Sequence, residues 1–96
     1  MIYIKIHKGR NILVAVCDEA LVGKEFHEGK LYLKISESFY KGELKTEAEV
    51  KHILFRYSYL NIVGKRSIAL ALELGIITQR AILFIQGVPH AQTISF

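Results

Sequence analysis

Two hydrogen-bonding side chains follow the only proline of the chain, close to its C-terminus. His90 and Gln92 come just after an apolar segment, and Pro89 restricts the backbone in front of them. Polar side chains held by a rigid residue at the end of a strand are typical of a small ligand site. The alternative is that both side chains bond to nearby backbone and only secure the end of the chain. Neither residue indicates a particular reaction, so we predict no catalytic residue.

Cys17 is the only cysteine and ends an apolar segment, where a buried and unreactive thiol is the usual outcome. A nucleophilic role would require a partner such as His27 or His90 brought close by the fold. A single cysteine also excludes an internal disulfide. Cys17 and the four histidines lack the close pairs that zinc sites show, so we predict no metal and no cofactor.

Residues 64–67, Gly-Lys-Arg-Ser, precede a predicted helix in the manner of a phosphate-binding loop. Such a loop requires a glycine, four residues, and then Gly-Lys-Ser/Thr. Tyr59 stands in place of the first glycine and Arg66 in place of the hydroxyl residue, which excludes this type of nucleotide hydrolysis. A weaker expectation is retained, in which the free amides of the helix N-terminus contact an anion together with Lys65 and Arg66. The alternative is a turn glycine followed by two solvated cations.

A helix is predicted to begin at Thr46, because Thr46 and Glu49 have the spacing of a capping box. The apolar residues that follow lie three and four positions apart, as on one buried stripe: Val50, Ile53, Leu54 and Tyr57. The opposite side combines cations with aromatic rings: Lys51, His52, Phe55 and Arg56, with Tyr59 just beyond. Such a surface could stack bases and contact phosphates. It could equally be covered by another element or form a homodimer contact.

The net charge of +4 falls entirely in the second half of the chain. Residues 51–96 hold five basic residues against Glu73 alone, whereas residues 1–50 hold eight of each sign. A region with a surplus of basic residues attracts anionic partners such as nucleic acid. A net charge of this size also serves solubility alone.

The leading hypothesis is therefore a non-enzymatic accessory domain that binds RNA or a ribonucleoprotein. The predicted RNA-binding residues are Lys51, Phe55, Arg56, Tyr59, Lys65 and Arg66. The first alternative is a protein-interaction module or homodimer that uses the aromatic face of the helix. The second is a small enzyme with a pocket near Cys17 and His90.

The elements that would position these residues form one domain over residues 1–96. Strands are predicted at residues 3–7, 12–16, 31–35, 60–63 and 81–85, and helices from residue 46 and over residues 67–74. This order predicts an α+β fold with a mixed sheet of about five strands and two helices. The strand at residues 81–85 is apolar on both faces and is expected inside the sheet. Residues 87–96 are expected to form a tail.

A membrane protein is not expected. The start of the chain alternates between apolar and other residues and lacks the continuous apolar run of a signal peptide. The longest nearly uncharged stretch, residues 67–79, is shorter than the ~18–20 residues that cross a bilayer. We therefore expect a cytoplasmic protein.

Five segments carry a family resemblance. They are Ala-Val-Cys-Asp at 15–18, Gly-Lys-Glu-Phe-His-Glu-Gly at 23–29, Phe-Tyr-Lys-Gly at 39–42, Asn-Ile-Val-Gly at 61–64 and Gly-Val-Pro-His-Ala-Gln at 87–92. With these segments the chain resembles the archaeal family called domain of unknown function 424, over almost its whole length. The resemblance implies an archaeal cytoplasmic protein and favours a role in information processing. It assigns no functional residues, because the family name itself leaves the activity open.

Overall fold

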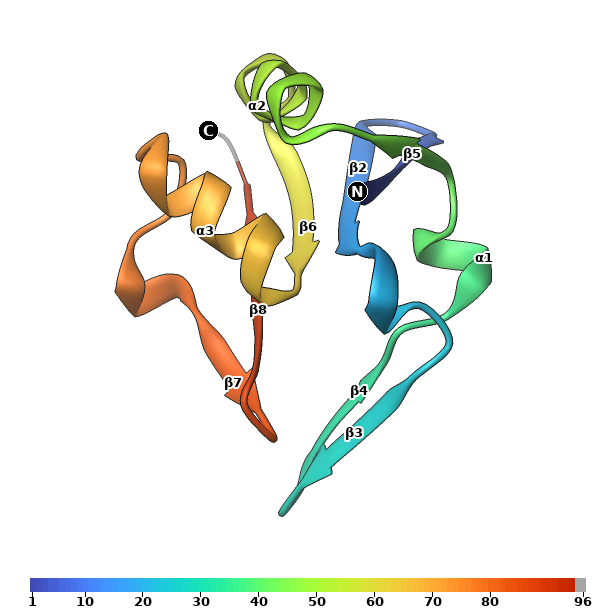
Figure 1. Ribbon diagram of the computed structural model, residues 1–96, viewed down its shortest axis with the longest axis vertical. Coiled ribbons are helices and arrows are strands. Elements are labelled where there is room, and N and C mark those ends of the chain that lie inside the picture. The colour runs from blue at the N-terminus through green and yellow to red at the C-terminus, as the bar shows by residue number, and fades with distance from the viewer. Residues whose placement is uncertain (95–96) are drawn as a thin grey trace.

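A six-stranded sheet forms the centre of the computed structural model, which describes residues 1–94 (Figure 1). The strands are β1 (Ile2–Lys8), β2 (Ile12–Asp18), β5 (Glu43–Lys45), β6 (Tyr59–Val63), β7 (Leu83–Ile85) and β8 (Val88–Thr93). They follow the order β5-β1-β2-β6-β8-β7. Strands β2 and β6 run parallel, and the other neighbouring strands run antiparallel. The predicted α+β fold with a mixed sheet is thus confirmed.

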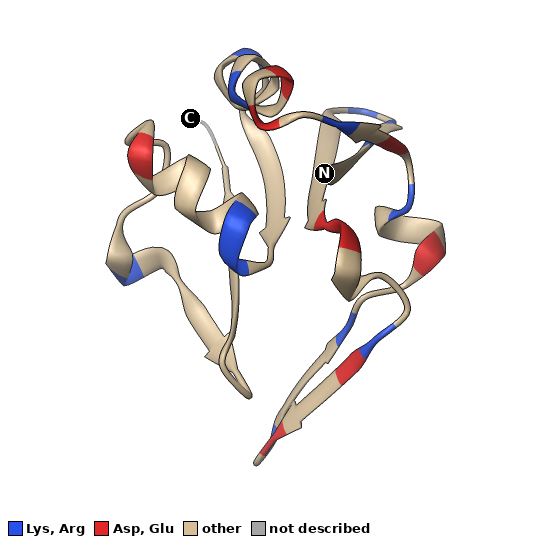
Figure 2. Cartoon of the chain, in the orientation of Figure 1, with Lys and Arg blue, Asp and Glu red and all other residues tan. Residues whose placement is uncertain are grey.

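Two helices, α2 (Glu47–Arg56) and α3 (Lys65–Glu73), pack on one face of this sheet. The amide of Thr46 donates to Glu49 Oε1 at 2.9 Å, and the Glu49 amide donates to the Thr46 hydroxyl at 3.2 Å. This capping box confirms the predicted start of α2. Buried apolar side chains of both helices and of the strands form the first core, which includes Val14, Val16, Val50, Leu54, Leu60, Ile62 and Ile68. Charged residues of both signs lie along α2 and at the two ends of α3 (Figure 2).

The second face of the sheet is covered only in part. A two-stranded sheet, β3 (Glu25–Glu28) and β4 (Leu31–Lys34), and the single turn α1 (Glu37–Tyr40) pack there. They enclose a second core of Ala15, Cys17, Leu33, Ile35, Tyr40, Val63 and Ile85. This core lies at the carboxyl ends of β2 and β6, whereas the beginnings of these two strands remain without such a cover.

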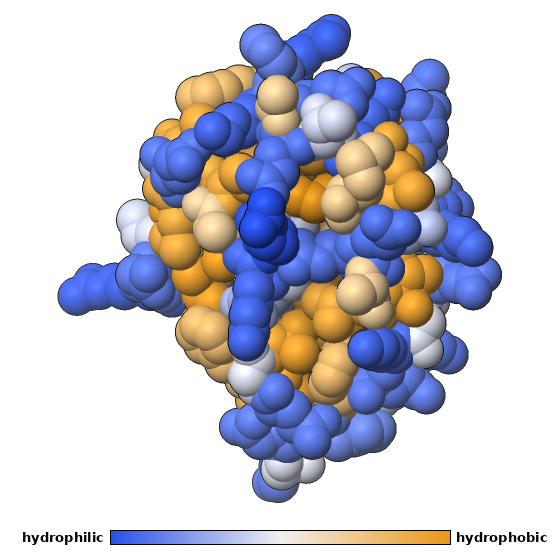
Figure 3. Space-filling model, viewed as in Figure 1, coloured by the Kyte–Doolittle hydropathy of each residue, from blue (hydrophilic) through white to orange (hydrophobic). Residues whose placement is uncertain are grey.

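Two short 3-10 helices, η1 (Glu19–Leu21) and η2 (Gln79–Ala81), complete the described part of the chain. Hairpins β3–β4 and β7–β8 project from the same end of the molecule (Figure 1), and apolar surface is visible between them (Figure 3). Within residues 1–94, no helix combines the length and the apolar character needed to cross a membrane.

Some sequence-based expectations about the elements were wrong. Residues 81–85 were expected inside the sheet, but β7 is a three-residue edge strand on which Leu83 and Phe84 are 46% and 51% exposed. The expected tail instead contains β8, which lies between β6 and β7. A tight turn explains the difference, because Gln86 and Gly87 both have positive φ angles, 50° and 79°, and return the chain at once. The strand predicted at residues 31–35 exists as β4 but pairs with β3 outside the main sheet, and α1 was not predicted.

Candidate functional site

The exposed part of the second sheet face gathers polar side chains from β6 and β8. Asn61 lies directly opposite Gln92 in the antiparallel pair, and Val63 lies opposite His90. Side chains alternate between faces along a strand, so Tyr59, Asn61, His90 and Gln92 share one face. Gln92 is exposed and the other three are half-buried. Residues that the sequence suggested for two separate sites therefore lie on one surface.

Two leucines complete this surface. Leu13 on β2 lies opposite Tyr59, and Leu83 on β7 lies opposite His90. Neither leucine nor Tyr59 packs into the second core. We call this surface the open strip and define it as Leu13, Tyr59, Asn61, Leu83, His90 and Gln92. A hollow of about 290 Å³ at its edge is lined by Leu83, His90 and Gln92 together with Ala81 and Ala91.

A hydrogen-bonded chain fixes the centre of the open strip. The Tyr40 hydroxyl donates to Asn61 Oδ1 at 2.6 Å, and His90 Nε2 lies 3.1 Å from the same oxygen. Because a carbonyl oxygen only accepts, His90 Nε2 donates, and Nδ1 of the neutral ring is then an acceptor. Burial lowers the pKa of His90, which favours this neutral form. Within residues 1–94 the Asn61 amide nitrogen has no hydrogen-bond partner, so it remains a donor for a ligand.

Sequence reasoning found Tyr59, His90 and Gln92 but missed Asn61, Leu13 and Leu83. Side chains alternate between the two faces along a strand, so Asn61 points away from the face on which its neighbours Leu60 and Ile62 are buried. What the pattern does not contain is the register between β6 and β8, which brings Asn61 to Gln92. The turn at Gln86 and Gly87, which was not predicted, returns the chain so that β8 lies between β7 and β6.

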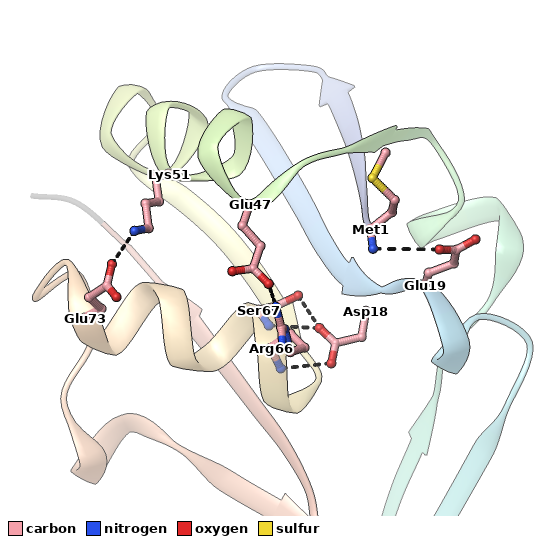
Figure 4. A network of polar contacts seen from close by, with 8 residues as sticks. All are labelled: Met1, Asp18, Glu19, Glu47, Lys51, Arg66, Ser67 and Glu73. Carbon is pink, nitrogen blue, oxygen red and sulfur yellow. Dashed lines mark hydrogen bonds and ion pairs between the residues drawn. The ribbon is translucent and has the colours of Figure 1, made fainter.

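The predicted basic surface lies on α2 and the start of α3, and ion pairs use half of its cations. Lys51 Nζ lies 2.6 Å from Glu73 Oε2, and Arg66 forms an ion pair with Glu47 (Figure 4). Both pairs join α2 to α3, so each cation faces a carboxylate of the other helix. Arg56 and Lys65 take part in no ion pair within residues 1–94.

The two predicted aromatic residues lie on different surfaces. Phe55 is 68% exposed on α2, where the Arg56 guanidinium lies 5.9 Å from the ring centre of Tyr57. Tyr59 lies on the sheet face opposite to α2. Phe55 and Arg56 therefore remain neighbours on exposed α2, whereas Tyr59 shares the opposite face of the sheet with His90 and Gln92.

The expectation of free amides at the N-terminus of α3 was wrong. Oδ2 of Asp18 accepts from the Arg66 amide at 3.0 Å, and Oδ1 accepts from the Ser67 amide at 2.8 Å and the Ser67 hydroxyl at 2.6 Å (Figure 4). An internal carboxylate thus occupies the place expected for a bound anion. Gly64 permits this contact, because a Cβ there would overlap the Asp18 carboxylate, and its φ of 110° is strained for other residues.

Cys17 is fully buried, as the sequence predicted. Its thiol donates to the Asp18 carbonyl oxygen at 3.2 Å, and burial raises the pKa of Cys17 to about 12. A thiol in this state is protonated at neutral pH and is a poor nucleophile. Cys17 does not line the hollow that contains His90. In residues 1–94, no three His, Cys, Asp or Glu side chains are close enough together to hold a metal ion.

Comparison with other proteins places the chain in a family. A crystal structure of an uncharacterized conserved protein from Methanopyrus kandleri is similar, with a TM-score of 0.76 and 25% sequence identity. The match covers 99% of this chain and 94% of that one. No curated protein matches the chain. The family described as "Protein of unknown function (DUF424)" matches residues 6–96, and the chain belongs to this family.

Proposed function

We propose that this protein is a non-enzymatic accessory domain of the cytoplasm that binds single-stranded RNA on the open strip. The observation that carries the proposal is the cross-strand register that places Tyr59, Asn61, His90 and Gln92 on one accessible surface. This surface differs from the one predicted on α2, where two cations already have internal partners.

The chemistry of the open strip suits unpaired bases. Proteins recognise single-stranded RNA by stacking its bases on aromatic rings and by hydrogen bonds to the edges of the bases. Tyr59 and His90 provide rings, and the side-chain amides of Asn61 and Gln92 provide donors and acceptors. The His90 Nδ1 acceptor and the Asn61 amide donor differ in kind, so the strip can distinguish one base edge from another.

Cations near the open strip would contact the phosphates. Arg80 is exposed and directly precedes Ala81, which lines the hollow beside His90. None of the ion pairs found in residues 1–94 includes Arg80. The net charge of +4 adds a general attraction for a polyanion.

Fluorescence anisotropy with labelled single-stranded RNA, measured over a series of salt concentrations, tests the proposal. We expect log affinity to fall with log salt concentration by about 0.7 for each phosphate contact, and Arg80→Ala to lower that slope by about one contact. Tyr59→Ala should weaken binding by about 1–3 kcal/mol with an unchanged slope. Tyr32→Ala is the matched control, because Tyr32 is 51% exposed on β4, away from the open strip. Absence of binding at low salt would contradict the proposal.

A protein-interaction or homodimer surface remains the second candidate function. It has one specific supporting observation, since the edge strand β7 exposes Leu83 and Phe84 and could pair with another strand. Association through apolar side chains and backbone hydrogen bonds depends little on salt. Sedimentation analysis that shows a dimer persisting at high salt, without RNA binding, would favour this function.

A further inference from the structure

A second hollow, of about 380 Å³, lies at the carboxyl ends of the parallel strands β2 and β6. Asp18 at the end of β2 lines it, as does Lys65, two residues after β6. In open α/β sheets ligands bind at the carboxyl ends of parallel strands, and β2 and β6 are the parallel pair of this sheet. The hollow shares no lining residue with the open strip. We call it the hairpin pocket, because β3 and the β7–β8 turn form its walls.

Hydrogen bonds between the two hairpins hold the hairpin pocket in shape. The side-chain oxygen of Gln86 accepts from the His27 amide at 2.9 Å. The Gln86 amide in turn donates to Glu28 Oε1 at 2.7 Å. Gln86 makes both bonds from a φ of 50°, the left-handed conformation that the tight turn between β7 and β8 requires. These two bonds join the two walls to each other in the absence of a ligand.

The lining of the hairpin pocket combines an apolar floor with two cations. Leu21, Phe26 and Val88 are half-buried and provide the apolar part of the lining. Lys24 and Lys65 line the same hollow, are exposed, and take part in no ion pair within residues 1–94.

Asp18 is the carboxylate of this lining, and both of its oxygens already have hydrogen-bond donors within the protein. Both of its oxygens accept hydrogen bonds from the first turn of α3, including two backbone amides. The lining therefore contains two lysines without an ion-pair partner and one carboxylate that already accepts three hydrogen bonds. This surplus is complementary to a ligand with a negative charge.

We propose that the hairpin pocket binds a small organic anion whose carboxylate or phosphate group meets Lys24 and Lys65 and whose apolar body covers Phe26 and Val88. The volume lies within the ~300–1,000 Å³ of small-molecule sites. The proposal is independent of RNA binding, because no residue of the open strip takes part. An inorganic anion would leave the ring of Phe26 uncovered, and an uncharged apolar molecule would leave Lys24 and Lys65 without a partner. Both should therefore bind more weakly than an organic anion.

Titration with 4-phenylbutyrate, followed by ¹H–¹⁵N NMR of the full chain, tests this site. We expect saturable shifts confined to the amides around Lys24, Phe26, Lys65 and Val88. The uncharged analogue 4-phenylbutyramide should bind about tenfold more weakly, because it loses the charge-assisted contacts. Inorganic phosphate, which lacks the apolar body, should also bind more weakly than phenylbutyrate.

Variants separate the charge effect from unfolding. Lys24→Gln with Lys65→Gln should reduce phenylbutyrate binding about tenfold or more. Lys30→Gln with Lys34→Gln removes the same charge from the β3–β4 hairpin, outside the pocket lining, and should leave binding unchanged. Shifts spread over the whole surface, equal binding of the amide, equal binding of phosphate, or equal loss in both double variants would each overturn the proposal. Loss of RNA binding in Tyr59→Ala with intact phenylbutyrate binding would show that the two sites are separate.

Discussion

At the scale of single residues, His90 links the candidate site to pH. Burial lowers its pKa below the ~6.5 of a free histidine, so the unfolded chain binds a proton more readily than the folded chain. The stabilisation from the neutral ring is complete above about pH 6.5 and is lost as the pH falls through the lower pKa of the folded state. Urea unfolding at several pH values should show this loss in the natural protein and not in His90→Gln. His52→Gln changes an exposed histidine and should keep the loss. An identical pH dependence in natural protein and His90→Gln would contradict the assignment.

Cys17 gives a second prediction at this scale. A protonated, fully buried thiol should react with iodoacetamide at neutral pH only as fast as the protein opens, and rapidly once it is unfolded in urea. Stabilising the fold should therefore slow the labelling further. Labelling of the native protein at the rate of a free thiol would show that the site is open.

At the scale of elements, the contact between β2 and α3 depends on Asp18. This carboxylate caps α3, whose first residue, Lys65, lies 47 positions later in the chain. Asp18→Ala removes three hydrogen bonds at the helix N-terminus and should lower the free energy of unfolding by about 2 kcal/mol. Ser67→Ala removes one of the three and should cost less. Thermal and chemical unfolding measure both, and a smaller loss for Asp18→Ala than for Ser67→Ala would contradict this role.

Local patterns predicted the elements whose determinants are close in sequence. The capping box gave the start of α2, alternation gave β1, and short, mainly apolar runs gave β2 and β6. The predicted position of β7 was wrong because its apolar residues Leu83 and Phe84 indicated a buried strand, yet the edge position leaves both exposed. Strand β8 was missed because proline and glycine favoured a tail. Pro89 nevertheless lies within β8, opposite Phe84 of β7, and pairing with β6 begins only at His90.

At the scale of the whole molecule, the two candidate surfaces can be compared directly. The sequence predicted the α2 surface with Phe55 and Arg56, and the structure adds the open strip on the opposite side of the sheet. Asp18 and Asn61 could not be identified beforehand, because their partners are remote in sequence and depend on strand order.

We expect Tyr59→Ala with Gln92→Ala to weaken RNA binding at least tenfold, and Phe55→Ala with Arg56→Ala to weaken it far less. Circular dichroism confirms folding of both. A larger loss of binding in Phe55→Ala with Arg56→Ala would instead indicate that RNA binds on α2.

The link between the two hairpins through Gln86 has a consequence for local opening. The β3–β4 hairpin buries mainly Leu33, and His27 and Glu28 near its tip are hydrogen-bonded to Gln86, which lies 59 and 58 positions further along the chain. Such a unit has little buried surface of its own and can detach while the central strands stay paired. Amide hydrogens of β3 and β4 should therefore exchange with solvent much faster than those of β2 and β6. In Gln86→Gly, which keeps the turn but removes the side-chain bond, the difference in protection should widen further, with β2 and β6 unaffected.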